Sequence, residues 1–257
     1  MASSGRADKR KKYGQNPVPL IILAACTVIF VILIGPPPAF NLAGWWSTDT
    51  PPVSRTLDSA YRDIASTDTG TMLMSLPVRE DNTRQKIPRY DREAFGARWA
   101  DIDHNGCDTR NDILSRDLSQ VTYKKGTKNC VVLSGKLQDP YTGQLIDFER
   151  GNETSKKIQI DHIVPLANAW ASGAWEWDEA TREKFANDPE NLLAVDGPAN
   201  QEKSAKTADE WLPKNKDFHC DYVKRQVKVK YAWKLSVTNA ERDAIANVLH
   251  SQCPTAS

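Results

Sequence analysis

The sequence lacks most features that would identify a class of protein at once. Among its 257 residues there are only 5 Cys and 3 Met, and the formal net charge at pH 7 is only +1. A strongly basic coat of the kind that spreads over nucleic acid is therefore absent. There is no internal repeat, and only one long hydrophobic run, so a repeat architecture and a polytopic membrane protein are excluded. The 40% hydrophobic and 26% charged content indicates a globular protein.

The small net charge is unevenly distributed. Residues 1–34 hold five basic side chains and one acidic one, which leaves 29 basic and 32 acidic side chains for the remainder of the chain. A polyanion would therefore have to bind a local patch of that acidic remainder. The first candidate for a surface that binds a nucleic-acid backbone is the stretch 201–234, with nine Lys or Arg against five Asp or Glu. Its residues Lys224, Arg225 and Lys228 lie about one turn apart on a probable helix, for which a solvated face is the favoured interpretation.

The N-terminus reads as a membrane-targeting segment. Residues 1–17 are basic, residues 18–34 are uncharged and mostly apolar, and residues 35–54 form a Pro-rich linker. An uncleaved signal anchor is favoured over a cleaved signal peptide, because no small-x-small cleavage site follows. The basic end would lie in the bacterial cytoplasm, and the rest would be exported, membrane-anchored and facing outward, or secreted. Lipidation at Cys26 is disfavoured because the apolar run continues beyond it.

The remaining cysteines predict disulfides. Cys107, Cys130, Cys220 and Cys253 lie in the part predicted to be exported, where three pairings are possible. Loop closure favours the near neighbours, Cys107 with Cys130 and Cys220 with Cys253. A zinc site is the alternative, but no pair has the two-to-four-residue spacing typical of zinc knuckles.

Residues 55–257 are predicted to form one α+β domain, because short strands and helices alternate irregularly. A turn at Asp139–Gly143 separates two of the strands, and a capping box at Thr238–Glu241 starts the last helix. The predicted strands are 131–137, 144–148 and 157–162, and the predicted helices are 55–66, 178–185, 216–234 and from the capping box to about residue 249.

The most informative residues are an Asp-His pair at the end of a predicted strand. Asp161 supplies an oxygen ligand beside the nitrogen base of His162, and Pro165 ends the strand. A helix starting near Ala199 would bring the amide oxygen of Asn200 to the same place. Oxygen ligands of this kind suit Mg²⁺, which leaves His162 available as a base.

The ordered motifs resemble the HNH, or ββα-metal, endonucleases, and within them the GmrSD-type C-terminal nuclease domain of exported bacterial proteins. The resemblance rests on Asp161–Pro165, followed by Asn191, Asn200 and Lys203, with Asn200 in place of the last His of the name. It extends over roughly residues 85–253 through the stretches 106–112, 139–143 and 211–213.

This resemblance implies a strand-strand-helix finger, embedded in a larger mixed domain with additional helices and a short antiparallel sheet. It implies Asp161 and Asn200 as ligands of Mg²⁺ (or Mn²⁺), and His162 as the general base that activates the attacking water. Asn191 would brace the loop so that a backbone carbonyl orients the imidazole. Lys203 is a candidate for holding a phosphate oxygen. An ordinary imidazole pKa, near 6.5, suits base work at neutral pH.

Two further candidates lie upstream of the motif. Arg110 is expected either to clamp a phosphate or to form a salt bridge with Asp112 or Asp117. The stretch Asp101–Asp112 follows the register of a calcium loop, but it ends in Asp rather than Glu, so a hydrogen-bonded turn is favoured over bound Ca²⁺. The residues in that register are Asp101, Asp103, Asn105, Gly106 and Asp112.

The sequence thus predicts a divalent-metal-dependent endonuclease that hydrolyses phosphodiester bonds in DNA, or in RNA, with little sequence preference. The cation would stabilise the leaving 3′ oxygen. The expected partners are nucleic acid, DNA in the first place, and the membrane through the N-terminal segment; no protein partner is inferred. The alternatives are a catalytically inactive exported binding or cell-surface protein on a nuclease scaffold, and an antibacterial nuclease toxin.

Overall fold

The computed structural model describes residues 52–80, 87–151 and 154–253. The predicted cytoplasmic segment 1–17, the apolar segment 18–34 and most of the linker 35–54 lie outside these ranges. Helix α2 (Pro52–Ile64) begins just before the predicted domain start at residue 55. Within the described ranges, no helix is both long and apolar enough to cross a membrane.

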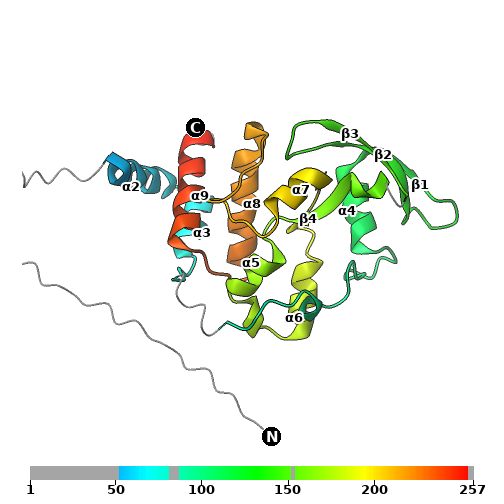
Figure 1. The fold of residues 1–257 in the computed structure, drawn as a ribbon, viewed down its shortest axis with the longest axis horizontal. Helices are drawn as coiled ribbons and strands as arrows, with labels where there is room; N and C mark the ends of the chain where they lie inside the picture. Colours follow the sequence, from blue (N-terminus) through cyan, green and yellow to red (C-terminus); the bar gives the residue numbers. More distant parts are fainter. Residues whose placement is uncertain (1–51, 81–86, 152–153, 254–257) are drawn as a thin grey trace, which may run out of the picture. The chain divides into compact units, whose positions relative to one another are not determined.

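The described chain is a mixture of helices and small antiparallel sheets, which confirms the predicted α+β class (Figure 1). The first sheet contains β1 (Ser119–Tyr123), β2 (Val132–Gln138) and β3 (Leu145–Glu149), in that order. The predicted turn joins β2 to β3: Asp139 Oδ2 accepts from the backbone of Thr142 at 2.7 Å, and Gly143 takes a φ of 75°, which glycine adopts without strain.

The second sheet and the helix after it form the predicted strand-strand-helix unit. Strand β4 (Ile158–His162) pairs antiparallel with β5 (Leu192–Asp196) and places Asp161 opposite Leu193. Helix α7 (Gly197–Lys203) follows β5 directly and packs on both strands.

Local chemistry fixes the start of α7. Asp196 caps the helix, because its Oδ1 accepts from the backbone of Ala199 at 2.8 Å. Gly197 is required for a close approach: a Cβ there would lie 2.2 Å from the carbonyl oxygen of Lys156. The N-terminus of α7 therefore packs closely against the backbone just before β4.

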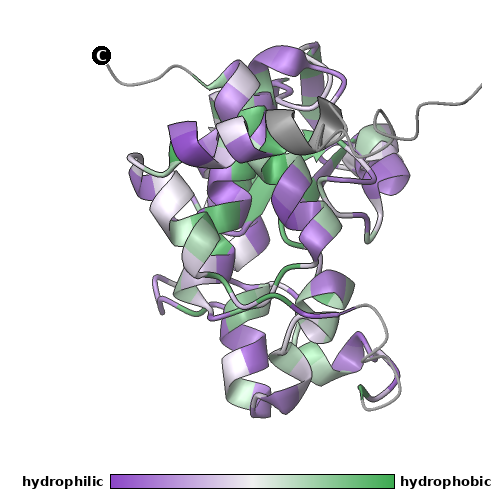
Figure 2. Ribbon diagram, turned by 90° about the vertical axis from the view of Figure 1, so that its left-hand side faces the viewer, coloured by the Kyte–Doolittle hydropathy of each residue, from purple (hydrophilic) through white to green (hydrophobic). Residues whose placement is uncertain are grey.

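Helices α2, α3 (Asp68–Ser75), α8 (His219–Ala232) and α9 (Asn239–Gln252) surround the largest core cluster. The predicted cap is present at α9, where Thr238 Oγ1 accepts from the backbone of Glu241 at 3.1 Å. Figure 2 shows hydrophobic segments gathered between the helices, with hydrophilic segments toward the outside. The short helix η6 (Lys216–Phe218) leads into α8.

The long spacer between His162 and Asn191 folds as a second core. It contains α5 (Leu166–Ala171), η5 (Ala174–Glu176) and α6 (Glu179–Ala186), and η3 (Glu93–Phe95) packs against α6. Its tryptophans pack as core residues: the Trp177 ring lies 5.5 Å from those of Phe185 and Trp233.

A third core lies between α4 (Thr109–Asp117) and the two sheets. Ile113 and Leu114 of α4 belong to this cluster together with Ile158 and Ile160 of β4. Helix η4 (Thr154–Lys156) connects β3 to β4. One face of β4 is therefore covered by α4 and the other by α7.

Both predicted disulfides are present. Cys107 is bonded to Cys130, which links the segment before α4 to the start of β2. Cys220 is bonded to Cys253, which links the start of α8 to the end of α9. The zinc alternative for these four cysteines is wrong.

Candidate functional site

The two residues of the Asp-His pair point to opposite faces of β4, as successive side chains of a strand do. Asp161 faces α7 and is buried. His162 faces the end of α6 and the loop that carries Trp99, and the residue as a whole is partly buried. Adjacent positions in the sequence therefore occupy two different environments.

Asp161 is the centre of a buried polar cluster. Tyr141 Oη donates to its Oδ2 at 2.5 Å, and Lys203 Nζ donates to its Oδ1 at 3.0 Å. The same ammonium also donates to the carbonyl oxygen of His162 at 2.8 Å. Lys203 thereby ties α7 to the end of β4.

The Asp161–Lys203 pair is almost fully removed from solvent, with side-chain exposures of 7% and 0%. Burial raises the pKa of Asp161 and lowers the pKa of Lys203, and their mutual attraction opposes both shifts. The sequence predicts Lys203 as a group that holds a phosphate oxygen. In the structure its ammonium instead holds Asp161, and no part of the side chain is open to a substrate.

Asn200 lies at the same interface between β4 and α7. Its Nδ2 donates to Gln159 Oε1 at 2.9 Å. Gln159 precedes Asp161 by two positions on the same face of β4, and Lys203 follows Asn200 by about one helical turn. Asp161 and Asn200 thus lie at one interface, where Asp161 is bonded to Lys203 of α7 and Asn200 is bonded to Gln159 of β4.

The donor types at this interface fit a hard divalent cation, because Mg²⁺ and Mn²⁺ prefer carboxylate and amide oxygens. The present bonds of Asp161 oppose a cation there, since Lys203 already supplies the positive charge. In the described part of the chain, no three His, Cys, Asp or Glu side chains are clustered to hold an ion. The residues therefore fit a divalent cation by the type of their donor atoms and by their location at one interface. The roles of Asp161 and Asn200 as ligands stay predictions.

The His162 ring is fixed by two contacts from outside the strand. Its Nε2 lies 2.8 Å from the carbonyl oxygen of Ala186 at the end of α6. A carbonyl can only accept, so Nε2 carries the proton and Nδ1 carries the lone pair. Trp99 lies parallel to the imidazole, with centroids 6.3 Å apart and an interplanar angle of 11°.

The environment of His162 corrects the prediction of an ordinary imidazole pKa. Burial lowers the pKa of His162 from 6.5 to about 4, and the bond to Ala186 opposes this shift only in part. The nearby positive charges of Arg92 and Lys203 lower the pKa further. The ring is consequently neutral at pH 7, which is the form that accepts a proton.

Asn191 braces the segment that follows β4. Its Oδ1 accepts from the backbone of Val164 at 2.8 Å, and its Nδ2 donates to the carbonyl oxygen of Val164 at 3.2 Å. Its own carbonyl accepts from the backbone of Ile163 at 2.8 Å. Asn191 is fully buried and holds the chain directly beyond His162. The family resemblance predicts a brace at this position, and its part in catalysis stays a prediction.

Arg110 lies on the first turn of α4, beside the open edge of β4. Its Nη2 donates to the carbonyl oxygen of Ile158 at 3.3 Å. The alternative of a salt bridge with Asp112 or Asp117 is wrong: Asp117 pairs with Arg116 at 2.6 Å, and Asp112 accepts from Asn105.

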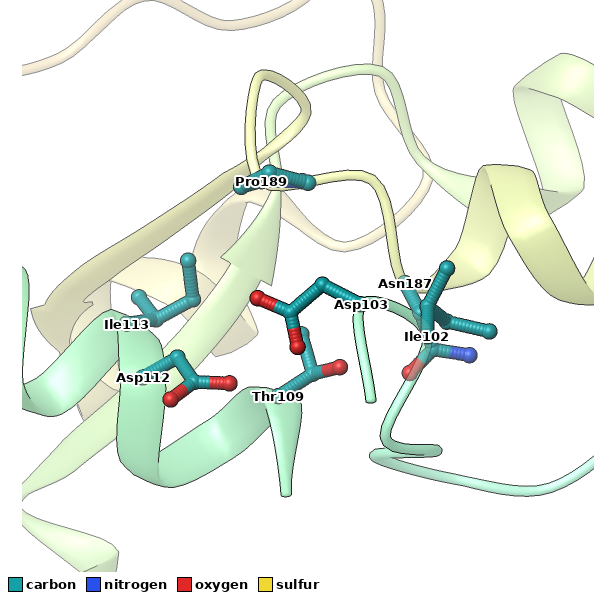
Figure 3. A pocket seen from close by; sticks show the side chains of 7 residues that line it. All are labelled: Ile102, Asp103, Thr109, Asp112, Ile113, Asn187 and Pro189. Carbon is teal, nitrogen blue, oxygen red and sulfur yellow. The ribbon is translucent and has the colours of Figure 1, made fainter. Parts of the chain in front are cut away.

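The Asp101–Asp112 loop adopts the hydrogen-bonded turn that the sequence favours. Asp101 accepts from the backbones of Asn105 and Gly106, and the Asn105 amide donates to Asp103 and Asp112. Figure 3 shows the carboxylates of Asp103 and Asp112 in a pocket that Thr109 and Ile113 also line. Burial raises the pKa of Asp112. Bound Ca²⁺ stays a prediction.

Three contributors to the site are not foreseen from the sequence motifs. Tyr141 lies in the predicted turn, but its bond to Asp161 depends on how the sheets pack. Ala186 acts through its carbonyl, which leaves no trace in the side-chain pattern. Trp99 lies in an irregular segment; its φ of 59° is rare for a bulky residue and is the only local sign of a constrained position.

Residues 108–248, more than half of the chain, match the family model of the C-terminal domain of GmrSD restriction endonucleases. The chain belongs to this family. It therefore carries a nuclease-type domain, as the ordered motifs predict. The match includes every candidate residue of the site, namely Arg110, Asp161, His162, Asn191, Asn200 and Lys203, whereas Trp99 precedes it.

A protein of Arthroderma benhamiae named "Uncharacterized secreted protein" is 34% identical over 192 residues, which cover 74% of this chain and 87% of that relative. No solved structure matches the chain. The family is therefore shown by sequence, and the geometry of the site is described by the structure of the chain itself.

Proposed function

We propose that the chain is an exported endonuclease that hydrolyses phosphodiester bonds, with His162 as the general base. The observation that carries the proposal is the state of the imidazole: its Nε2 proton is held by the Ala186 carbonyl, and no hydrogen bond joins Nδ1 to any described residue. A neutral ring with one free lone pair can take the proton of a water molecule that attacks phosphorus.

The surrounding residues would keep the base in this state. Ala186 fixes which nitrogen carries the proton, and Trp99 restricts the plane of the ring. Asn191 holds the chain beyond His162, so the imidazole would not need to reorient before it accepts a proton. Arg110, on the neighbouring helix, would hold a phosphate oxygen.

DNA is the substrate proposed first, and RNA remains an outcome of the test. Contacts to a phosphate backbone do not read base sequence, so cleavage would show little sequence preference. Export is supported by the basic and apolar N-terminal segments and by the name of the Arthroderma benhamiae relative. A signal anchor in residues 18–34 remains part of the proposal.

A divalent cation also belongs to the proposal. Mg²⁺ or Mn²⁺ would be held by Asp161 and Asn200 and would supply charge neutralisation at the phosphate and at the leaving 3′ oxygen. Support comes from the oxygen donors on β4 and α7. The Lys203 ammonium on Asp161 is the contrary observation, so cation dependence has to be measured.

The test is digestion of duplex DNA, single-stranded DNA and RNA by the full chain, with Mg²⁺, with Mn²⁺ and with EDTA. We expect cleavage with either cation and none with EDTA. Cleavage that persists in EDTA would remove the cation from the proposal. No cleavage of any substrate under any of these conditions would overturn the nuclease assignment.

A second candidate is an inactive nucleic-acid-binding protein on the nuclease scaffold. The specific observation in its favour is that both Asp161 oxygens are already occupied by Tyr141 and Lys203. The same digestion assay, combined with a binding measurement in EDTA, separates the two candidates, because an inactive scaffold binds the oligonucleotide without cleaving it.

A further inference from the structure

A cationic cleft lies along the open edge of β4, next to the His162 site. Its lining comes from the loop before α4, the first turn of α4, the end of β3, helix η4 and β4 itself. The residues include Trp99, Arg110, Arg150, Ser155, Lys156 and Gln159. The described lining contains three cationic side chains and no Asp or Glu, which is unusual in a domain whose overall charge is slightly acidic.

Two arginines line this cleft, and its described lining holds no carboxylate beside them. In the described ranges, neither Arg110 nor Arg150 forms an ion pair. The positive charge of Arg150, together with burial as the larger cause, lowers the pKa of Arg110. The charge of Asp108 opposes this shift, but the two oxygens of Asp108 accept from the backbone and side chain of Asn111. An anion bound between the arginines would relieve their repulsion.

The guanidinium of Arg150 is held rigidly in place. It donates through Nε to the carbonyl oxygen of Val132 and through Nη2 to Asn111 Oδ1, both at 2.5 Å. Its Nη1 remains available as a donor. Arg110 keeps only the long bond to Ile158. The fixed Nη1 of Arg150 and the less constrained guanidinium of Arg110 are donors that suit the oxygens of a phosphate.

The cleft is continuous with both halves of the proposed active site. Trp99 lines the cleft and also stacks on His162. Gln159 lines the cleft and also accepts from Asn200 on α7. A nucleic-acid strand that reaches His162 would therefore pass along the edge of β4 where the arginines lie.

We infer that this cleft binds a backbone phosphate adjoining the scissile one, through Arg110 and Arg150, with the neighbouring nucleotide against Trp99. The inference rests on the proposed nuclease function. It moves the main backbone contact away from the basic stretch of α8, where Lys224, Arg225 and Lys228 lie, and assigns it to the edge of β4. An aromatic face beside a cationic groove is a general arrangement for single-stranded nucleic acid.

The test measures binding separately from cleavage. Affinity of the full chain for a labelled single-stranded oligonucleotide is measured in EDTA at several salt concentrations. We expect Arg110→Gln and Arg150→Gln each to weaken binding by roughly tenfold at low salt and to flatten the slope of log affinity against log salt by about 0.7. A side chain that is merely structural would not change that slope.

Lys125→Gln is the matched control, because it removes one exposed charge in the turn between β1 and β2; it should bind as the wild type does. Arg110→Lys, which keeps the charge and loses the fork, should fall between wild type and Arg110→Gln. Circular dichroism and thermal melting monitor the fold of Arg150→Gln, whose bonds to Val132 and Asn111 are lost.

The outcomes separate this inference from the nuclease proposal. The phosphate-binding role of the cleft would be overturned by unchanged affinity and salt slope in both folded arginine variants, even if the wild type cleaves DNA. It would also be overturned if only Lys228→Gln, on α8, lost affinity. Weakened binding in both variants would support the cleft even if no cleavage is found. Inorganic phosphate and a 5′-mononucleotide serve as competitors; competition as strong as that of the oligonucleotide would assign the cleft to free phosphates and overturn the backbone role.

Discussion

The two faces of β4 place side chains that can carry charge in different environments. On the α7 face, Asp161 is buried between the Lys203 amino group and the hydroxyl of Tyr141. On the α6 face, His162 is neutral, stacked on Trp99 and bonded to a backbone carbonyl. The first arrangement joins the strand to its helix, and the second leaves one nitrogen lone pair available. A motif of two adjacent residues therefore combines a structural anchor with a candidate base.

Removing the ammonium should produce the largest change on the anchor face. Lys203→Met leaves the Asp161 carboxylate buried without its partner, which we expect to lower the free energy of unfolding by about 3–5 kcal/mol. Urea denaturation at pH 7 with intact disulfides measures the change. Lys206→Met, an exposed position just beyond α7, should shift stability by no more than about 0.5 kcal/mol.

The double variant Asp161→Asn with Lys203→Met sharpens this prediction. It removes both charges, so part of the lost stability should return. If Lys203→Met alone is as stable as the wild type, the ion pair does not anchor α7. The claim that the α7 face of β4 has a structural role would then be wrong.

A smaller effect is expected from the brace that serves the His162 face. Asn191→Ala leaves the buried backbone N–H and carbonyl of Val164 without their side-chain partners, which should cost about 1–3 kcal/mol of unfolding free energy. We also expect kcat/KM for DNA cleavage to fall, because the chain beyond His162 loosens. A variant with reduced stability but unchanged kcat/KM would restrict Asn191 to a structural role.

The smallest effect is expected from opening the His162 ring to water. Trp99→Ala should raise the pKa of His162 from about 4 toward 6.5, by about one unit, which corresponds to about 1.4 kcal/mol. Since a base must be unprotonated, activity at pH 5 should fall while activity at pH 8 stays the same. The acid limb of kcat/KM against pH measures this.

Trp99→Phe keeps an aromatic face over the imidazole and is the matched control; its acid limb should remain near that of the wild type. An unchanged acid limb in Trp99→Ala would show that other neighbours exclude water from the ring.

Elements with strong local signals were predictable from the sequence. The turn at Asp139–Gly143, the strands that flank it and helix α9 after Thr238 all lie close to their expected positions. β1 gives no such signal, because its pairing with β2 is irregular and its exposure does not alternate cleanly. β5 is a short continuous apolar run, which periodicity alone does not distinguish from a buried helix.

The sequence selects the candidate residues of the site but not their surroundings. Asp161, His162, Asn191 and Asn200 could be selected by spacing along the chain. The burial of Lys203 could not be, since it follows polar residues on a short helix that would ordinarily face solvent. The lowered pKa of His162 likewise depends on the tertiary structure, through burial of the ring and the positive charges of Arg92 and Lys203, which are distant in sequence.

The most direct test of the account compares the wild type with His162→Ala. Both purified full-length proteins digest duplex DNA at pH 7 with Mg²⁺, and their melting curves are recorded in parallel. The account predicts that kcat/KM falls by about 10²–10⁴-fold while the melting curve still shows a cooperative fold. Equal rates of cleavage by the two folded proteins would contradict it, because the imidazole would then have no part in the reaction.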